Sequence, residues 1–590
     1  MKIFILLVVS LFFRLIYLGV VPVSIAHDET DNIIQAHSLI QTGSDIVGTW
    51  QPFALLPNSG VMSELGPFIN TAVLSIFPNN LFTNRLTTAL LSSLFPLLLL
   101  YWLKTLKVDS KVGYISAFML AVSPWHILFS RTVLEQPTSL FFYLLSWIYL
   151  SKVFQKIEFK KSYYLNSILF ALFYSIGFFT YHGYKFSLPI LTGVLVLWHI
   201  WDTNLKTQYI RAIFPILVIC SLLIRTFIMS DHYASRESEL LFFNTSSYEK
   251  IIDQDRRLSL APEILKKFYS NKPVKLVQNM KDKYLGALNP DLLYSHGESN
   301  GVFSTWQTGY LYLFTIPFLI VGLGYLIMTH SKQHILILVL LLLSPLASII
   351  HVNNTLAFRS GIYFVFLNII TAYGLIEAFK LLLHVSLKLR YIIYTIFGCI
   401  FLTSIMYFSY IYFFVTPVTN ANAYFYSDRV IANYLRLSPN SKTLLLVRQP
   451  RYLYSAVILT HSDITRSDIA SFNHLYSPTD LDYYQTNNLT IVRNCKDVTS
   501  NTYETVIVDK NMLIDMGDCV PIRSLTQNNA KLLISSFVSP KDSGEEYRIF
   551  GDKLCDGIDL STYVHPTDLK DFNLESMNRE DFCSKWVVRQ

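Results

Sequence analysis

The chain has 590 residues, of which 52% are hydrophobic and only 15% are charged, with a mean hydropathy of +0.38. Soluble proteins carry roughly 25% charged residues, so this composition excludes an ordinary soluble domain, and apolar runs of about 20 residues indicate a polytopic membrane protein. The net charge of +7 gives no reason to expect a nucleic-acid partner, because the Lys and Arg residues cluster in short loops between the apolar runs.

Eleven apolar segments are predicted to cross the membrane. They are residues 3–21, 86–103, 112–128, 137–150, 164–180, 186–201, 212–229, 308–328, 334–350, 361–383 and 391–415. The loops after the even-numbered spans are short and basic, which places them and the N-terminus in the cytoplasm. The other loops and residues 416–590 then lie outside the cytoplasm, and we expect a multi-pass protein of the plasma membrane.

The first outer loop begins with an acidic pair, Asp28 and Glu29, directly after the first span. Charges at a helix exit cost little, yet they can face a lipid-linked substrate at the interface. Apolar residues at helical spacing from Ile33 to Ile40 predict an amphipathic helix in the interface that ends at Gly43. The alternative is that the two acids only complement the dipole of this helix.

The other outer loops and the outer ends of the spans carry cations and further polar residues. The predicted topology places them on the same side of the membrane as this acidic pair. They include Asp31, Asp45, Glu64, Arg85, Arg131, Glu135, His182, Lys185, Arg359 and the segment 291–298. Arg and Lys side chains suit an anionic lipid headgroup, while a carboxylate beside them can do proton chemistry. Three of these residues have simpler interpretations. Arg131 and Glu135 have the spacing of a structural salt bridge, and the position of Lys185 equally suits an anchor at the membrane boundary. The basic stretch around Lys266 is interpreted as a solvated face.

A transferase outside the cytoplasm has no nucleotide sugar or ATP to use, and it needs an activated donor that is anchored in the membrane. A polyprenyl-phosphate sugar is such a donor. The acceptor hydroxyl must lose a proton, and the departing lipid phosphate gains negative charge. An aspartate base and phosphate-facing cations meet these two requirements.

Several short motifs occur in order along the predicted topology. They are D-E at 28–29, T-G-S-D-I-V-G at 42–48, N-R-L at 84–86, S-P-W-H-I-L-F-S-R-T-V-L-E at 123–135, Y-H-G-Y-K at 181–185, N-P-D-L-L-Y at 289–294 and F-R-S at 358–360. With these motifs the chain resembles the membrane-embedded GT-C glycosyltransferases, in particular the protein O-mannosyltransferases and their bacterial and archaeal relatives. The resemblance runs from about residue 10 to 380.

The resemblance implies a GT-C catalytic domain over residues 1–415, with outer loops 24–85 and 230–305. It implies Asp28 as the catalytic base with Glu29 as its partner, and inversion at the anomeric carbon without a covalent intermediate. The implied donor-phosphate residues are Arg85, Arg131, Lys185 and Arg359, with Glu135, Asp45, Glu64 and His182 in support. Relatives use mannose or other sugars. The acceptor stays open between a protein hydroxyl, a lipid, a wall polymer and a glycan.

No cofactor is firmly implied. The D-E pair differs from the D-x-D of metal-dependent GT-C relatives, although a divalent cation near Asp28 could also touch His27 and Asp31. The loop 230–305 is too short for the β-trefoil domain of the protein mannosyltransferases, which weakens the case for a protein acceptor.

Residues 416–590 form a predicted extracytoplasmic α/β domain. Strand-like runs occur at 443–447 and 505–508, and a helical stretch at 428–437. Four cysteines lie here, at Cys495, Cys519, Cys555 and Cys583. Outside the cytoplasm they predict one or two disulfides, with three possible connectivities.

Two other functional classes fit a polytopic chain. A transporter or lipid flippase would show internal repeats and broken helices in matching halves, and neither is found in the sequence. A non-catalytic scaffold gives no reason to place Asp28 opposite several outer cations. The glycosyltransferase is therefore the favoured prediction.

Overall fold

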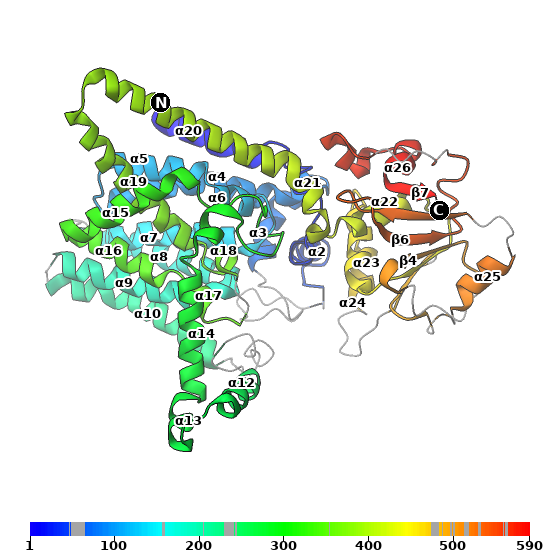
Figure 1. The fold of residues 1–590 in the computed structure, drawn as a ribbon, viewed down its shortest axis with the longest axis horizontal. Helices are drawn as coiled ribbons and strands as arrows, with labels where there is room; N and C mark the ends of the chain where they lie inside the picture. The colour runs from blue at the N-terminus through cyan, green and yellow to red at the C-terminus, as the bar shows by residue number, and fades with distance from the viewer. Residues whose placement is uncertain are drawn as a thin grey trace.

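The protein is described here from a computed structural model. It covers residues 1–46, 48, 65–155, 160–203, 206–228, 241, 245–352, 355–473, 483–486, 488–495, 498, 502–512, 519–528, 533–558, 560 and 565–589. Figure 1 shows a helical part built from the first two thirds of the chain, and beside it a C-terminal part built on a sheet.

Apolar helices, most of them long, make up the helical part. They are α1 (Lys2–Leu15), α4 (Leu81–Thr105), α5 (Ser110–Ala121), α6 (Pro124–Phe129), α7 (Glu135–Phe154), α8 (Lys160–Thr180), α9 (Ser187–Thr203), α10 (Lys206–Ile228), α15 (Ile316–Thr329), α16 (Lys332–Leu343), α17 (Leu346–Ile349), α19 (Ile362–Leu381) and α20 (Leu387–Tyr410). Among the described residues, six helical segments have the length and hydropathy of a membrane span, and three further apolar helices are shorter. The predicted polytopic helical class is confirmed, while the number of eleven spans stays a prediction.

Shorter helices connect these elements at the loops. They are α2 (His27–Thr42), α3 (Leu65–Leu74), η1 (His182–Tyr184), α12 (Thr245–Leu258), α13 (Glu263–Tyr269), α14 (Lys272–Gly286), η3 (Asp291–Ser295), η4 (Leu313–Thr315), α18 (Leu356–Arg359) and η5 (Leu382–His384). The third predicted span is divided between α5 and α6, because Pro124 lacks the N–H that would continue the helix from Ala121.

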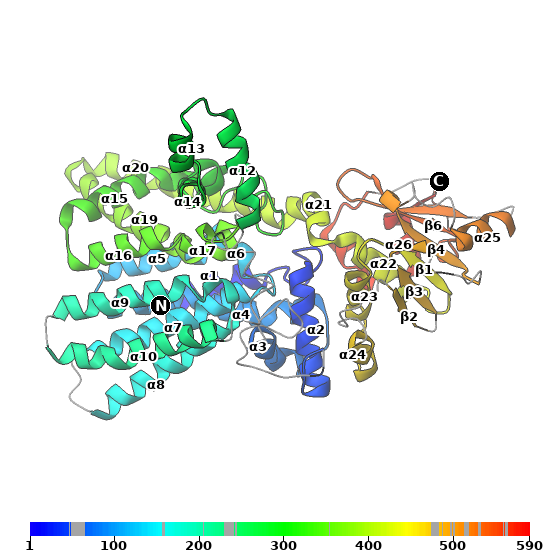
Figure 2. The same ribbon diagram turned by 90° about the horizontal axis from the view of Figure 1, so that it is seen from below.

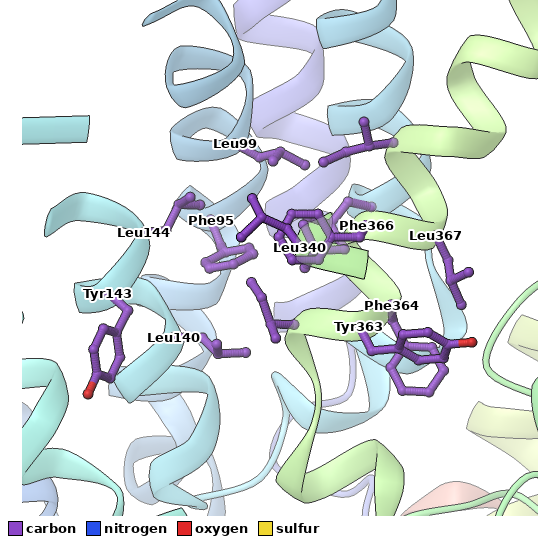
Figure 3. Packing of buried hydrophobic residues seen from close by; sticks show 14 of the residues in the cluster. Phe95, Leu99, Leu140, Tyr143, Leu144, Leu340, Tyr363, Phe364, Phe366 and Leu367 are labelled. Carbon is purple, nitrogen blue, oxygen red and sulfur yellow. The ribbon is translucent and has the colours of Figure 1, made fainter. Parts of the chain in front are cut away.

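The core of the helical part lies where α4, α7, α16 and α19 meet. Phe95, Leu99, Leu144, Leu340 and Phe366 pack there as buried side chains (Figure 3). Helices α15 and α19 approach one another especially closely, since a Cβ atom on either Gly322 or Gly374 would overlap the backbone of the facing helix. Small residues of this kind let helices pack in an apolar environment where the hydrophobic effect does not hold them together.

The C-terminal part is a mixed α/β domain, as predicted. Its seven strands are β1 (Thr443–Leu446), β2 (Tyr483–Gln485), β3 (Leu489–Val492), β4 (Thr505–Asp509), β5 (Ile534–Val538), β6 (Glu545–Phe550) and β7 (Val587–Arg589), in the order β2-β3-β1-β4-β6-β5-β7. Strands β3, β1 and β4 are parallel, with Leu445 opposite Ile491 and Ile507, and the other pairs are antiparallel. Strands buried on both faces read as continuous apolar runs, which is why β1 and β4 were visible in the sequence.

Helices cover both faces of this sheet. They are η6 (Ile411–Val415), α21 (Thr416–Thr419) and η7 (Ala421–Tyr424) on the approach to the sheet, then α22 (Tyr426–Leu437), α23 (Pro450–Leu459), α24 (Arg466–Asn473), α25 (Val520–Asn528), η10 (Leu569–Phe572), η11 (Leu574–Ser576) and α26 (Arg579–Trp586). Leu445 and Ile507 share a buried cluster with residues of α22, α23 and α26, whereas Leu444 and Val506 share one with Leu525 of α25.

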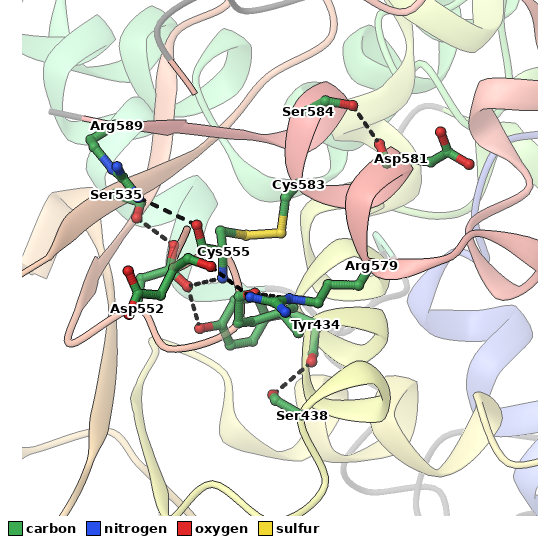
Figure 4. Close-up of a disulfide and its surroundings, with 12 residues drawn as sticks. Tyr434, Ser438, Ser535, Asp552, Cys555, Arg579, Asp581, Cys583, Ser584 and Arg589 are labelled. Atoms are coloured by element: carbon green, nitrogen blue, oxygen red, sulfur yellow. Dashed lines mark hydrogen bonds between the residues drawn. A yellow bond between two sulfur atoms is a disulfide. The ribbon is translucent and has the colours of Figure 1, made fainter. Parts of the chain in front are cut away.

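Two disulfides are present, within the predicted one or two, and they pair the cysteines in sequence order. Cys495 pairs with Cys519, and Cys555 pairs with Cys583. Figure 4 shows the second bond beside Asp552, whose carboxylate accepts hydrogen bonds from the Tyr434 hydroxyl (2.8 Å) and the Cys555 N–H (3.0 Å). The disulfide therefore connects α26 to the loop of Cys555, and the buried carboxylate of Asp552 stabilises the same loop.

The helix predicted after the acidic pair is α2, and it ends at Gly43, whose φ of 73° suits a residue without a side chain. Its expected position in the lipid interface is wrong. Residues Glu29 to Ser38 are all buried inside the protein, with α3 on one side and α23 and α24 of the C-terminal domain on the other. Figure 2 shows α2 between the two parts of the molecule.

Candidate functional site

The first turn of α2 places its two acids in opposite environments. Glu29 is fully buried, and its carboxylate accepts hydrogen bonds from the Ala26 N–H (3.2 Å) and the Val133 N–H (2.7 Å). Burial raises the pKa of Glu29, although the guanidinium of Arg85, 3.8 Å away, and the two N–H groups act against this rise. Asp28 is exposed. The two acids predicted to act together therefore differ: the buried Glu29 carboxylate binds backbone N–H groups, and the Asp28 carboxylate is accessible.

Two of the predicted phosphate-binding cations are buried beneath this turn. Arg85 donates to the carbonyl oxygens of Pro22 (2.8 Å) and Ser24 (2.5 Å), and Arg131 donates to those of Phe13 and Arg14 (both 3.0 Å) and Val21 (2.9 Å). Neither side chain is exposed to solvent. In this structure both guanidinium groups shape the connection between α1 and α2, and their contact with a phosphate stays a prediction.

The segment between α6 and α7 brings Glu135 close to α2. Asn32 donates to the Val133 carbonyl (3.0 Å), and a Cβ atom on Gly66 would lie 2.8 Å from Cγ of Glu135 and 3.6 Å from Oδ1 of Asn32. Glu135 therefore lies beside the helix turn that follows Asp28. The next residue, Gln136, donates to the Tyr184 hydroxyl (2.8 Å) and so connects this segment to the turn that carries the next cation.

Lys185, His182 and Arg359 lie on two turns that contact each other. The rings of Tyr181 and Phe358 are 5.1 Å apart. Lys185 is buried, with its Nζ 5.8 Å from the centre of the Phe178 ring, whereas Arg359 is partly exposed. These turns bring two of the predicted cations to one side of the candidate site.

Glu298 joins the same region from the segment 291–298. Its Oε1 accepts the Ala357 N–H at 2.7 Å, and burial raises its pKa to about 7. Asp45 is buried in the turn that follows α2, where its carbonyl accepts the Gly48 N–H (2.9 Å). Glu64 lies outside the described residues.

The C-terminal domain contributes side chains that the sequence did not indicate. The His27 ring stacks between Phe425 (3.3 Å between ring centres) and Tyr452 (3.6 Å), and its Nε2 is 3.8 Å from a carboxylate oxygen of Asp428. These residues are about 400 positions from His27 in the chain, so no local pattern could have placed them beside it.

A second contact joins Asp31 of α2 to Arg451 of α23 at 2.8 Å. Burial raises the pKa of Asp31 to about 6, although the guanidinium of Arg451 opposes the rise. The C-terminal domain is therefore bound to the turn that presents Asp28 by an aromatic stack and by a partly buried ion pair.

A cavity of about 570 Å³ opens between α2, the start of α4 and the C-terminal domain. Its lining mixes aromatic rings with groups that can donate and accept hydrogen bonds. It includes Ser24, His27, Thr30, Asn79, Asn80, Asn84, Phe425, Asp428, Tyr452, His461 and Asp463. His27 and Thr30 of α2 line this cavity, and Asp28, which is exposed, belongs to the same helix turn.

The three residues considered for a divalent cation are close in sequence but are held by other partners. His27 lies in the aromatic stack, and Asp31 pairs with Arg451. Within the described part of the chain, no group of three or more His, Cys, Asp or Glu side chains is arranged to hold a metal ion. A cation near Asp28 stays a prediction.

Residues 63–229 match the family described as dolichyl-phosphate-mannose-protein mannosyltransferase. No curated protein matches the chain. Among solved structures, the chain is similar to ArnT from Cupriavidus metallidurans, in its apo state and bound to undecaprenyl phosphate, with 9% identity, 93% of this chain and 97% of that chain covered, and a TM-score of 0.51. It is also similar to the archaeal oligosaccharyltransferase AglB from Archaeoglobus fulgidus, in complex with an inhibitory peptide and a dolichol-phosphate, with 10% identity, coverage of 98% and 77%, and a TM-score of 0.45.

These comparisons confirm the predicted resemblance and the GT-C fold. The family match begins before α3 and ends with α10, so it includes Arg85, Arg131, Glu135 and Lys185. Asp28 and the C-terminal domain lie outside it. Their roles rest on the geometry of this chain.

Proposed function

We propose that the chain is a membrane glycosyltransferase that moves a mannose-like hexose from a polyprenyl-phosphate donor to an acceptor hydroxyl, with Asp28 as the general base. The family match of residues 63–229 supports this class of donor. The observation that carries the proposal is the position of Asp28. It is exposed on the first turn of α2, the turn whose His27 and Thr30 line the cavity, while the neighbouring Glu29 is buried and accepts hydrogen bonds from the Ala26 and Val133 N–H groups.

In the proposed reaction, the Asp28 carboxylate accepts the proton of the acceptor hydroxyl as its oxygen bonds to the anomeric carbon. The bond between that carbon and the phosphate oxygen breaks on the opposite face, so the product has the inverted configuration. The lipid phosphate leaves with the electron pair and gains negative charge. Lys185 and Arg359 are the cations proposed to stabilise it, because both lie on outer turns close to Gln136 and Glu298.

The proposed site lies on the outer face of the plasma membrane. The basic loops after the even-numbered spans support this orientation, and the two disulfides of the C-terminal domain support an oxidising compartment. Acceptors and donor would then both approach from outside, and the cavity beside α2 is the proposed entrance for the acceptor.

The test compares purified wild type with Asp28→Asn, each incubated in membrane extract with radiolabelled polyprenyl-phosphate mannose. Loss of a general base lowers the rate by about 10²–10⁴-fold, so label should leave the lipid with the wild type and remain on it with the variant. Asp556→Asn, an exposed aspartate of the C-terminal domain far along the chain from α2, is the matched control and should transfer normally.

The chemical nature of the labelled product identifies the acceptor class. Equal transfer by wild type and Asp28→Asn would remove Asp28 from the mechanism. Absence of transfer with mannose, followed by transfer with another polyprenyl-phosphate sugar, would overturn the choice of mannose and leave the role of Asp28 to be measured with that sugar.

A further inference from the structure

Three helices form an arm that stands out from the helical part. The arm comprises α12, α13 and α14, residues 245–286. Figure 1 shows α14 directed across the long apolar helices and not along them, and Figure 2 shows α12 and α13 standing out beyond the bundle. Because those helices run along the membrane normal, a helix that crosses them at the side of the bundle runs along the membrane surface.

The arm exposes an unusual number of large apolar side chains. Exposed fractions are 75% for Leu258, 103% for Leu260, 82% for Ile264, 68% for Phe268 and 64% for Tyr269. Neither α13 nor α14 contains a buried residue. Contiguous apolar surface of this kind marks a docking surface, so the interpretation of this stretch as a solvated face accounts only for its charges.

The same segment is basic. Residues 245–286 contain nine Lys and Arg against five Asp and Glu, a net charge of +4. The acids are largely used within the arm: Lys272 pairs with Glu249 and Lys266 with Glu263, both at 2.9 Å, and Lys275 pairs with Asp255. An excess of positive charge is therefore left beside the exposed apolar side chains.

The arm is an ordered unit and not a loose extension. Tyr248 and Ile252 of α12 pack with Leu241 and contact Leu276 and Met280 of α14. This small internal core uses one side of each helix. The apolar residues around α13 take no part in it and remain available for a partner outside the chain.

The base of the arm is joined to the span of residues 334–350 and to the turn that follows it. The Nζ of Lys283 donates to the carbonyls of His351 and Val352 (2.8 Å for the latter), and the Tyr284 hydroxyl donates to the Leu342 carbonyl (3.1 Å). The turn after His351 carries Arg359, on the donor side of the proposed site. The arm thus leaves the bundle beside the end of this span, which the predicted topology places on the outer side of the membrane.

We propose that this arm lies on the outer surface of the bilayer, with the apolar residues of α13 inserted among the lipids and its Lys and Arg residues on anionic phospholipid headgroups. Interfacial helices combine the same two features, apolar insertion and attraction to anionic lipid. The bilayer is the occupant that the geometry favours, because the arm is continuous with the lipid-facing surface of the spans and carries the complementary charge. The inference does not depend on the identity of the sugar or of the acceptor.

The experiment measures how deep α13 lies in the bilayer. Full-length protein with Cys220→Ser and Cys399→Ser, the two free cysteines, receives a single spin label at Phe268→Cys and is reconstituted in liposomes of phosphatidylethanolamine and phosphatidylglycerol. The accessibility of the label to oxygen and to a water-soluble nickel chelate is compared with two controls. Ile396→Cys, exposed on the apolar helix α20, reports lipid, and Lys541→Cys, exposed in the C-terminal domain, reports water.

The label at position 268 should favour oxygen over the chelate, as the label at 396 does. Values like those at 541 would overturn the proposal and would indicate that a protein partner, absent from the liposomes, covers the arm in the cell. For the charge component, the oxygen preference at 268 should fall about twofold or more when phosphatidylglycerol is replaced by phosphatidylcholine. It should fall similarly in Lys266→Glu/Lys267→Glu, while Lys541→Glu should leave it unchanged. Identical values in both lipids would overturn the role of anionic headgroups.

Discussion

At the scale of single residues, the acidic pair shows how one helix turn separates two roles. Neighbouring side chains on a helix point about 100° apart, so Asp28 and Glu29 cannot both face the same substrate. Glu29 faces the protein, where two backbone N–H groups and Arg85 surround its carboxylate. Asp28 faces outward. Glu29 is therefore best described as a positioning residue for the turn that carries Asp28.

Replacing Glu29 by Gln tests this positioning role. The amide oxygen of Gln can accept one of the two N–H hydrogen bonds, but the NH₂ group cannot accept the other. The substitution also leaves the buried Arg85 without a carboxylate partner. Removing one partner of a buried ion pair costs about 3–5 kcal/mol, so Glu29→Gln should lower the thermal stability in detergent and lower transfer. Glu29→Asp retains the charge and should recover part of both. A variant with unchanged stability and lost transfer would instead assign Glu29 a direct chemical role.

The pH dependence of stability should report Asp31. Its pKa is about 6 in the folded protein and about 4 in an unfolded chain. Between these values the folded state binds the proton more tightly, so the contribution of Asp31 to the free energy of unfolding falls as the pH rises from about 4 to about 6, by about 3 kcal/mol, and is constant above that range. The wild type should therefore gain melting temperature relative to Asp31→Asn as the pH is lowered from 7.5 to 5. Parallel melting curves for the two proteins would contradict the raised pKa.

At the scale of elements, α2 is the helix on which both parts of the molecule meet. Its N-terminal turn is held by the segment between α6 and α7, and its buried face packs on α3 and on α23 and α24. This explains why a helix with an interfacial sequence pattern is not at the lipid surface. The C-terminal domain covers the apolar side that lipid would otherwise contact.

The aromatic stack on His27 should contribute measurably to this contact. Two stacked ring contacts together amount to about 1–3 kcal/mol. We expect His27→Ala to loosen the C-terminal domain, which hydrogen exchange would detect as faster exchange in α22 and α23. His27→Phe keeps both ring contacts and should retain slow exchange there. Slow exchange in both variants would mean that the ion pair of Asp31 with Arg451 is sufficient to hold the domains together.

At the scale of the whole molecule, one buried side chain joins the ends of the chain. Arg429 of α22 donates to the carbonyls of Val23, in the connection before α2, and of Phe572 (3.1 Å), and it pairs with Glu575. The C-terminal domain is thus part of the structure around the proposed site and not an appendage.

The disulfide between Cys555 and Cys583 should matter for the integrity of this domain. A disulfide that closes a loop of this length stabilises a domain by about 2–4 kcal/mol. Cys583→Ser should therefore lower the melting temperature of the purified protein, and mild reduction should do the same to the wild type. Cys399→Ser removes a free, exposed cysteine and should have no effect. Peptide mapping without reduction would detect a different pairing, which would contradict the connectivity described above.

Much of the fold could be predicted from local patterns. Apolar runs located the long helices, and the buried strands β1 and β4 were recognisable because both of their faces are apolar. The break after Ala121 was missed because Pro124 lies inside a run that is mostly apolar and long enough for one span. For the site, the acidic pair and the outer cations were found by sequence. The burial of Arg85 and Arg131 was not, because an arginine that binds backbone carbonyls has the same sequence context as one that faces a phosphate.

The sequence by itself determined that this is a polytopic membrane protein, that an acidic pair follows its first apolar helix and that a cysteine-containing α/β domain follows its last. These features depend on hydropathy and on periodicity, which act over a few residues to about twenty. Only the tertiary structure decided that Asp28 faces outward while Glu29 is buried, and that Phe425, Asp428 and Tyr452 complete the region around His27. Such contacts join segments hundreds of residues apart, and the packing of the two domains, which no local pattern encodes, brings them together.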